Sequence, residues 1–289
     1  MHAFHRSKLL TALAAVVLGA SVSLAAASPA QAVSGQIVTV GWSTLTGSEP
    51  IKTANALCPA GKVVLGGGAD IVDGGNEVRL TSIEPTWAVY PTHSYYAVAM
   101  EDGGYAGNWT VYAWAICGNP VPGWEVVSTY KAAASTTSDT VQAVAVCPAG
   151  KKVIGTGGVT IGGYRFRLVA VHPTYDHVLV GVSPDETASG SFGARAYAIC
   201  TDPIGQVLVD VDSGYSSSNK AVTAACPAGT TVHGAGAFIN GGTVWRQVHL
   251  NRIGFWGPGA LSGADLAAHE DETGYAGNWH VMLTAICAP

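Results

Sequence analysis

The residues with the clearest chemical potential are carboxylates that recur in groups at three places along the chain. Neighbouring carboxylates can bind Ca²⁺ or act as the acid and nucleophile of a glycosidase. Adjacent residues of an extended chain point in opposite directions, which is poor geometry for a catalytic pair. We therefore interpret these groups as solvated turns, with a Ca²⁺ site and then catalysis as alternatives. The groups are Glu101-Asp102, Asp185-Glu186 and Glu270-Asp271-Glu272.

An aromatic loop follows the first and the last of these acidic groups. The sequence Gly-Tyr-Ala-Gly-Asn-Trp occupies residues 104–109 and again 274–279. Ligand sites combine aromatic surface with a few convergent polar groups, so these loops are the sharpest candidates for sugar binding. Trp109 and Trp279 are instead expected in the core, because Phe192 replaces them in the middle of the chain. The candidate ligand-binding residues are Tyr105, Asn108, Asp102, Tyr275, Asn278 and Asp271.

Three arginines, Arg79, Arg167 and Arg246, also fall at matching places. They indicate either a repeated hydrogen bond to a turn carbonyl or three equivalent ligand pockets. We favour the hydrogen bond, because a guanidinium fork readily caps neighbouring backbone. The chain has no Gly-x-Ser-x-Gly, His-Glu-x-x-His or Walker motif, and its histidines occupy unmatched positions. No catalytic residue, metal site or cofactor is therefore predicted.

The cysteines divide the chain into repeated units that carry these residues. The chain contains three copies of one unit, which opens with Cys-Pro-Ala-Gly and closes with Ala-Ile-Cys. Six cysteines allow 15 pairings, but similar units most simply close on themselves. Each bridge would then stabilise the fold by about 4 kcal/mol in the loop-entropy description. The predicted disulfides are Cys58–Cys117, Cys147–Cys200 and Cys226–Cys287.

A Gly-x-Gly motif follows the first cysteine of every copy and leaves one face of a strand without side chains. Glycine weakens a strand unless a ring or another backbone approaches closely. The last strand of each copy has an apolar face that begins with Trp109, Phe192 or Trp279. We expect one of these rings to pack on each bare face. The glycines are Gly66 and Gly68, Gly155 and Gly157, and Gly234 and Gly236.

Short, β-branched segments bounded by Gly and Pro predict five or six strands in each copy and no amphipathic helix. The β repeats span residues 36–118, 124–202 and 205–288, and short Pro/Gly joints connect them. We expect an all-β fold of three antiparallel repeats packed as one domain with pseudo-threefold symmetry, as in a β-prism. Three tandem small β-sandwiches are the alternative.

Residues 1–32 have the features of a signal peptide: a basic start, an apolar run and Ala30-Gln31-Ala32 before the expected cleavage site. A membrane anchor is the rival interpretation. All six cysteines lie beyond this segment, which fits an oxidising, extracellular location. Without Arg6 and Lys8, 12 Lys and Arg stand against 19 Asp and Glu. This balance argues against nucleic acid or an anionic membrane as a partner.

The Cys-Pro-Ala-Gly-x-x-Val-x-Gly-x-Gly start and the Ala-Ile-Cys end resemble a unit found in many uncharacterised secreted bacterial proteins. The resemblance covers nearly all of the chain beyond residue 32 and implies no particular activity. The threefold recurrence is also distantly similar to the vitelline membrane outer layer protein, a β-prism with suspected glycan affinity. The repeats of that protein are markedly shorter, so no residue role is carried over.

These features favour a secreted, non-enzymatic binding protein whose partner is a glycan or a cell-wall polymer. A structural or protein-interaction role at the cell envelope is the alternative. A secreted hydrolase that uses the acidic loop of one repeat is the third hypothesis. One binding site and three binding sites are both compatible with the repeats.

Overall fold

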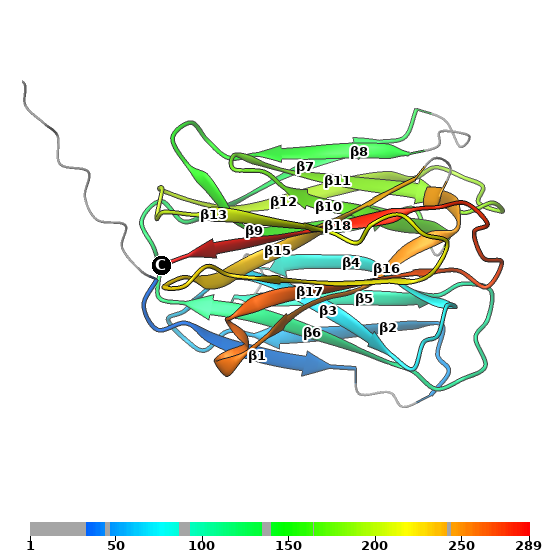
Figure 1. The fold of residues 1–289 in the computed structure, drawn as a ribbon, viewed down its shortest axis with the longest axis horizontal. Coiled ribbons are helices and arrows are strands. Elements are labelled where there is room, and N and C mark those ends of the chain that lie inside the picture. Colours follow the sequence, from blue (N-terminus) through cyan, green and yellow to red (C-terminus); the bar gives the residue numbers. More distant parts are fainter. Residues whose placement is uncertain (1–32, 44–46, 87–92, 135–139, 164, 242–243) are drawn as a thin grey trace, which may run out of the picture.

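The computed structural model describes residues 33–43, 47–86, 93–134, 140–163, 165–241 and 244–289. The signal peptide predicted for residues 1–32 lies outside these ranges. The described chain forms 18 strands in three six-stranded antiparallel sheets (Figure 1). The helical segments within these ranges are two 3₁₀ turns, η1 (Val244–Arg246) and η2 (Pro258–Ala260). The predicted all-β fold is confirmed.

Each repeat supplies six consecutive strands. The first repeat forms β1 (Ile37–Trp42), β2 (Ile51–Leu57), β3 (Val63–Val72), β4 (Val78–Thr86), β5 (Ser94–Glu101) and β6 (Thr110–Gly118). The second forms β7 (Glu125–Ala132), β8 (Val141–Val146), β9 (Lys152–Ile161), β10 (Phe166–Pro173), β11 (His177–Pro184) and β12 (Gly193–Thr201). The third forms β13 (Val207–Asp212), β14 (Lys220–Ala225), β15 (Thr231–Asn240), β16 (Val248–Trp256), β17 (Gly263–Glu270) and β18 (His280–Ala288).

Every sheet takes three strands from one repeat and three from another. The first sheet has the order β1-β6-β3-β16-β17-β14, the second β2-β5-β4-β9-β12-β7, and the third β13-β18-β15-β10-β11-β8. The repeats are therefore interleaved around a pseudo-threefold axis, as a prism-like body requires. Three tandem sandwiches would instead keep the strands of each repeat together in sheets of their own.

The glycines of the Gly-x-Gly motifs let the backbones of different repeats approach closely. A Cβ added to Gly66 would lie 2.2 Å from the carbonyl oxygen of His233 in the third repeat. The equivalent neighbours are the Leu65 carbonyl at 2.1 Å from a Cβ on Gly155, and the Ile154 carbonyl at 2.7 Å from one on Gly234. The expected aromatic partner is therefore wrong at these three positions, because the close neighbour is the main chain of another repeat.

The second glycine of each motif likewise meets a strand of another repeat. A Cβ on Gly68 would lie 2.0 Å from the carbonyl oxygen of Ile253, and one on Gly236 would lie 2.0 Å from that of Val171. A Cβ on Gly157 would lie 2.7 Å from Cδ of Pro85. None of the expected rings, those of Trp109, Phe192 and Trp279, is among these close neighbours. The ring beside the Gly68 position is that of Phe255, at 3.3 Å.

All three predicted disulfides are formed: Cys58–Cys117, Cys147–Cys200 and Cys226–Cys287. Each one connects the two halves of a repeat, which belong to different sheets. Cys58 follows β2 of the second sheet, for example, and Cys117 lies in β6 of the first. The apolar faces predicted for the last strands are buried, and Trp109, Phe192 and Trp279 are 1%, 3% and 0% exposed.

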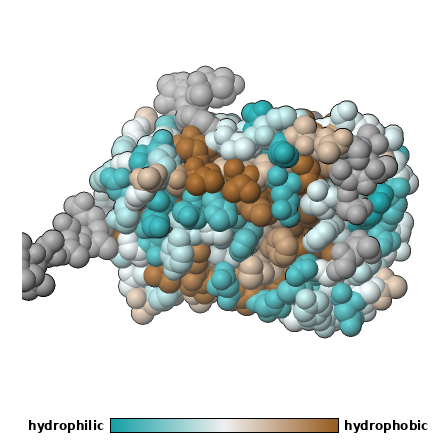
Figure 2. Space-filling view, turned by 90° about the horizontal axis from the view of Figure 1, so that it is seen from above, coloured by the Kyte–Doolittle hydropathy of each residue, from teal (hydrophilic) through white to brown (hydrophobic). Residues whose placement is uncertain are grey.

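The start of β1 and the end of β18 lie at the same end of the molecule. Here the Val33 N–H donates to the Pro289 carbonyl at 3.1 Å. Figure 2 looks onto the side that carries β7 and β8, where apolar side chains are interspersed with polar ones. Exposed apolar residues on these strands include Tyr130, Val144 and Val146. In the described ranges, no helix has the length and apolar character needed to span a membrane.

Candidate functional site

One aspartate in each acidic group is buried, so the interpretation of these groups as solvated turns is wrong for the aspartates, whereas Glu186 and Glu272 are exposed. Asp102, Asp185 and Asp271 are 6%, 2% and 2% exposed. Each follows the fifth strand of its repeat, and the interleaving of the repeats brings Asp102 and Asp271 to one guanidinium. Arg167 Nη2 lies 2.8 Å from Asp102 Oδ2, and Arg167 Nη1 lies 2.7 Å from Asp271 Oδ2. Arg79 forms a second ion pair with Asp102.

The third arginine predicted to match Arg79 and Arg167 does not occupy their position. Arg79 and Arg167 are the second residues of β4 and β10, and the second residue of β16 is His249. The turn η1 adds residues before β16, which displaces Arg246 from the strand. Arg246 Nη2 instead donates to the backbone carbonyl of Asp185 at 3.0 Å, the kind of turn contact that we favoured. We call Arg79, Arg167, His249, Asp102, Asp185 and Asp271 the axial cluster.

The basic residues of the axial cluster are fully shielded from solvent. Arg79 and His249 are 0% exposed, and Arg167 is 1% exposed. Burial, reinforced by the charges of Arg167 and Arg79, holds the pKa of His249 well below its usual range. Burial also lowers the pKa of Arg79, while its ion pair with Asp102 opposes that shift. His249 is therefore a neutral member of an otherwise charged set.

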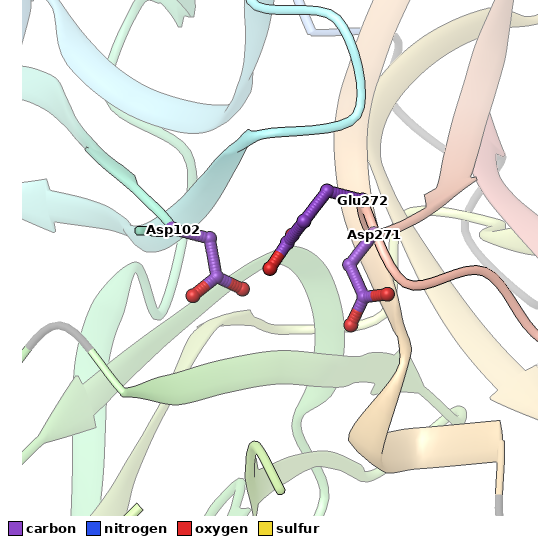
Figure 3. A group of neighbouring side chains, drawn as sticks. All are labelled: Asp102, Asp271 and Glu272. Atoms are coloured by element: carbon purple, nitrogen blue, oxygen red, sulfur yellow. The ribbon is translucent and has the colours of Figure 1, made fainter. Parts of the chain in front are cut away.

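A pocket of about 280 Å³ opens above the axial cluster. Glu272, which is exposed at its mouth, has a pKa raised by partial burial and by the charges of Asp102 and Asp271. Figure 3 shows Asp102, Asp271 and Glu272 close together, with their carboxylates directed into one region. The pocket is lined by Asp102, Gly103, Arg165, Arg167, Asp185, Glu186, Thr187, Gln247, Glu272 and Thr273. All of these lining residues except Gly103 have polar or charged side chains.

The aromatic loops do not present open rings. Tyr105 and Tyr275 are half-buried and pack against the hydrophobic core. The Tyr105 hydroxyl donates to the backbone carbonyl of Asp73 at 2.8 Å, and Tyr275 makes the equivalent bond at 3.3 Å. Asn108 and Asn278 are exposed beside them. Of the six predicted binding residues, the structure thus brings Asp102 and Asp271 together and leaves the tyrosines and asparagines in two separate loops.

Each buried tryptophan belongs to a small polar unit inside the protein. Trp109 Nε1 donates to Glu101 Oε1 at 3.0 Å, and Lys52 Nζ lies 4.6 Å from the centre of the indole ring. Trp279, Glu270 and Lys220 repeat this arrangement at 2.9 and 4.5 Å. The residues at the same strand positions in the second repeat are Phe192, Pro184 and Val141. Where the tryptophan is missing, both the glutamate that accepts from its N–H and the lysine over its ring are missing too, which indicates a structural unit.

The outer face of the first sheet carries a row of aromatic and charged residues, of which Trp42 is exposed and the others are half-buried. In the ladder, Trp42 lies opposite Tyr112, Tyr112 opposite Asp70, and Asp70 opposite Arg252. Directly opposed residues share a face, so this row crosses β1, β6, β3 and β16. Trp114 lies two residues along β6 from Tyr112 and therefore faces the same way. We call Trp42, Tyr112, Trp114, Asp70 and Arg252 the aromatic face; its Trp42 is 61% exposed.

Two ion pairs hold the Arg252 side chain at the centre of the aromatic face. Arg252 Nη1 lies 2.6 Å from Asp70 Oδ2, and Arg252 Nη2 lies 2.9 Å from Asp265 Oδ2. The guanidinium carbon of Arg252 is 5.3 Å from the centre of the Trp114 ring, within cation–π range. Burial raises the pKa of Asp70, although Arg252 acts in the opposite direction. Two hollows flank this centre, about 470 Å³ beside Trp114 and about 260 Å³ beside Arg252.

The other two sheets lack this combination. The residues at the positions of Trp42, Tyr112 and Trp114 are Tyr130, Arg195 and Tyr197 in the second sheet. In the third sheet they are Asp212, Met282 and Thr284. The sequence already places Tyr112 and Trp114 on the less buried side of β6, but it does not reveal that Trp42 lies opposite Tyr112. The available signal for this face was the pair Tyr112 and Trp114, because the last strands of the other two repeats have no such aromatic pair on their outward side.

The fold and this surface define an all-β protein of three interleaved repeats, each closed by its own disulfide, with the aromatic face on the first sheet. No protein-family model matches the chain, and no curated protein is significantly similar to it.

Proposed function

We propose that this chain is a secreted, non-enzymatic protein that binds a carbohydrate, in particular a polysaccharide of a cell surface, through the aromatic face. The observation that supports this best is the cross-strand row of Trp42, Tyr112, Asp70 and Arg252, with Trp114 beside it. Aromatic rings combine a large apolar face with a polar edge, and a sugar ring likewise has an apolar side and a hydroxyl rim. The aromatic face can therefore stack on the apolar side of a sugar ring and hydrogen-bond to its hydroxyl groups.

The spacing of the rings favours an extended chain of sugars over a single one. Neighbouring strands lie about 4.8 Å apart, and residues two apart on a strand are separated by roughly 6.8 Å. Trp42 and Tyr112 are thus offset by one step across the strands, and Tyr112 and Trp114 by one step along β6, so the three side chains cover an area wider than one strand. The hollows on both sides extend the surface along the sheet, which supports a polymer as the ligand.

The charged residues on the aromatic face suit recognition better than catalysis. Asp70 and Asp265 are both ion-paired to Arg252, so each carboxylate already accepts hydrogen bonds from a guanidinium. The remaining lone pairs of these carboxylates and the remaining N–H groups of the Arg252 guanidinium can hydrogen-bond to sugar hydroxyls. Secretion is supported by the three disulfides, which are typical of extracellular proteins, together with the signal peptide predicted for residues 1–32.

The test is a binding screen with purified, disulfide-intact residues 33–289. Pull-down on insoluble polysaccharides and affinity electrophoresis in soluble ones should identify at least one retained polymer. Titration of that polymer should also change the tryptophan fluorescence, because Trp42 is exposed on the proposed surface. A broad panel without retention would contradict the proposal. Self-assembly or retention by envelope proteins alone would favour the structural alternative.

A further inference from the structure

Trp256, the last residue of β16, is a further exposed aromatic residue on the outer side of the first sheet. Arg252, Gly254 and Trp256 alternate along β16 without a break in register, so they share the side that carries the aromatic face. The Trp256 side chain is 36% exposed. Four residues of a strand separate it from Arg252, which is a distance of roughly 14 Å. The first sheet therefore carries outward aromatic side chains at two places along its strands.

A glycine makes room for the Trp256 ring on the sheet. Gly263 lies opposite Trp256 in the β16–β17 ladder, and a Cβ added to it would lie 2.7 Å from Cζ2 and 2.8 Å from Cε2 of the indole. The ring thus occupies the space that a side chain at position 263 would need. The indole N–H donates to the backbone carbonyl of Ala264 at 3.1 Å. Because that N–H is the polar group of an indole, the exposed part of the ring is apolar surface.

The equivalent strands of the other sheets carry no aromatic residue at this place. The ladders between repeats put Arg252, Ser82 and Ala170 at equivalent positions. Four residues further along these strands are Trp256 in the first sheet, Thr86 in the second and Thr174 in the third. The rings of the aromatic face come from the first repeat, whereas Trp256 comes from the third. Two repeats thus place outward aromatic residues on the same sheet, which points to a shared ligand.

The hollow of about 470 Å³ beside Trp114 extends from the aromatic face towards the hairpin that follows Trp256. Its lining includes Val40 and Trp114 from the first repeat and Gly259 and Leu261 from the β16–β17 hairpin. These residues are mostly apolar, as the surface beneath the apolar side of a sugar chain should be. The hollow therefore gives a ligand on the aromatic face space to continue towards the third repeat.

The charges on this surface favour an uncharged ligand. Arg252 pairs with both Asp70 and Asp265, so the three side chains together carry one net negative charge. Charged residues are absent from the described lining of the hollow beside Trp114. An acidic polymer would meet like charge at the centre of the aromatic face, which is unfavourable. An uncharged chain of sugars would only exchange hydrogen bonds with water for hydrogen bonds with these side chains.

We propose that Trp256 is a second contact for the polysaccharide, and that this ligand is an uncharged chain that extends along the first sheet from the aromatic face to Trp256. This inference rests on the proposed carbohydrate binding. A short sugar reaches one of the two contacts, whereas a longer chain reaches both. The second contact of a bound chain is intramolecular, so it adds affinity without the cost of a separate association. Trp256 therefore sets the preference for long chains over short ones.

The experiment is isothermal titration of disulfide-intact residues 33–289 with matched disaccharides and hexasaccharides of glucose, mannose and N-acetylglucosamine. The best hexasaccharide should bind the wild type at least about tenfold more tightly than its disaccharide. Trp256→Ala should remove most of that advantage and leave the affinity for the disaccharide within about twofold. Trp256→Leu keeps an apolar side chain over Gly263 and should lose the advantage equally, whereas a purely structural role would be largely preserved by leucine.

Trp245→Ala is the matched control. Trp245 is also partly exposed, and its N–H likewise donates to a backbone carbonyl, that of Ile239 at 2.7 Å, but it lies in η1 outside the first sheet. This variant should keep the preference for the hexasaccharide. An unchanged preference in Trp256→Ala and Trp256→Leu, or equal losses in Trp245→Ala, would overturn the role of Trp256.

Two further outcomes separate this inference from the proposed function. If a polymer is retained in the screen but none of the hexasaccharides binds more tightly than its disaccharide, the second contact is overturned and the carbohydrate binding stands. If no polymer is retained, both fail. Affinity electrophoresis should also show stronger retention by hydroxyethylcellulose, galactomannan or glycol chitin than by carboxymethylcellulose, alginate or hyaluronate. Strongest retention by one of the acidic polymers would overturn the uncharged class of ligand.

Discussion

A Cβ on Gly66 would lie 2.2 Å from the carbonyl oxygen of His233, a residue of a different repeat. The same relationship links Gly155 to Leu65 and Gly234 to Ile154, so the three repeats touch through their backbones around the pseudo-threefold axis. A real Cβ cannot approach a carbonyl oxygen so closely, and a shift at one glycine would displace strands in two repeats. The Gly-x-Gly motif is therefore the condition for interleaving the three repeats.

Gly66→Ala should destabilise the protein by about 3 kcal/mol or more, the upper end of the usual range for overpacking. The added methyl group meets main-chain atoms, which cannot move aside as a side chain can. Denaturant unfolding monitored by tryptophan fluorescence measures the change. Gly181→Ala in β11 is the control, because its nearest neighbour would be Cβ of Ala170 at 3.2 Å, and it should cost much less. Equal losses for the two variants would argue against the backbone contact.

Trp109 and Glu101 should be energetically coupled. Trp109→Phe removes the indole N–H and leaves a buried carboxylate without that donor, while Glu101→Ala leaves the N–H without an acceptor. Hydrogen bonds to charged groups contribute about 1.5–3 kcal/mol. The loss in the double variant should therefore be smaller than the sum of the single losses by about 1–3 kcal/mol. Strict additivity in chemical unfolding would show that the pair is not a unit.

The stability of the protein should fall on acidification through His233. Burial lowers the pKa of His233 to about 4 in the folded state, against an ordinary value of 6.5. A base with a lowered folded pKa supports stability fully above pH 6.5, and this contribution is lost as the pH falls towards 4. The loss amounts to roughly 3 kcal/mol. His249 shifts in the same direction, so it adds a further slope.

His233→Leu isolates this effect, because the equivalent positions in the other repeats are Leu65 and Ile154. The free energy of unfolding of the wild type and of the variant should be measured from pH 7 to pH 4. The difference between the two should shift in favour of the variant by roughly 3 kcal/mol across that interval. Parallel curves would show that His233 titrates normally in the folded protein.

The local pattern of the sequence was enough to predict the strands, the disulfides and the buried faces of the last strands. The pairing of Cys58 with Cys117 followed from the repeat, and Trp109 was assigned to the core because Phe192 replaces it. These features depend on neighbours within one repeat. The exchange of strands between repeats depends on contacts such as Ala69 with Ile253, which are far apart in the sequence and leave no local signature.

The errors in the candidate site have the same origin. Asp102 and Asp271 occur in sequences that read as polar turns, and they are buried because the repeats converge on Arg167. The assignment of Arg246 to the position of Arg79 failed because η1 lengthens the third repeat before β16. The aromatic face was missed because Trp42 and Tyr112 are far apart in sequence and meet only in the β1–β6 ladder.

The most direct test of the central claim compares Trp42→Ala with Tyr130→Ala in polysaccharide binding. Tyr130 is the symmetry equivalent of Trp42 on the second sheet and is likewise exposed, at 50% against 61%. Both variants should unfold like the wild type, because both rings lie at the surface of edge strands. We expect Trp42→Ala to weaken the affinity for the retained polymer at least about tenfold, equivalent to about 1.4 kcal/mol, and Tyr130→Ala to leave it unchanged. Unchanged affinity of Trp42→Ala, or equal losses in both variants, would contradict the aromatic face as the binding site.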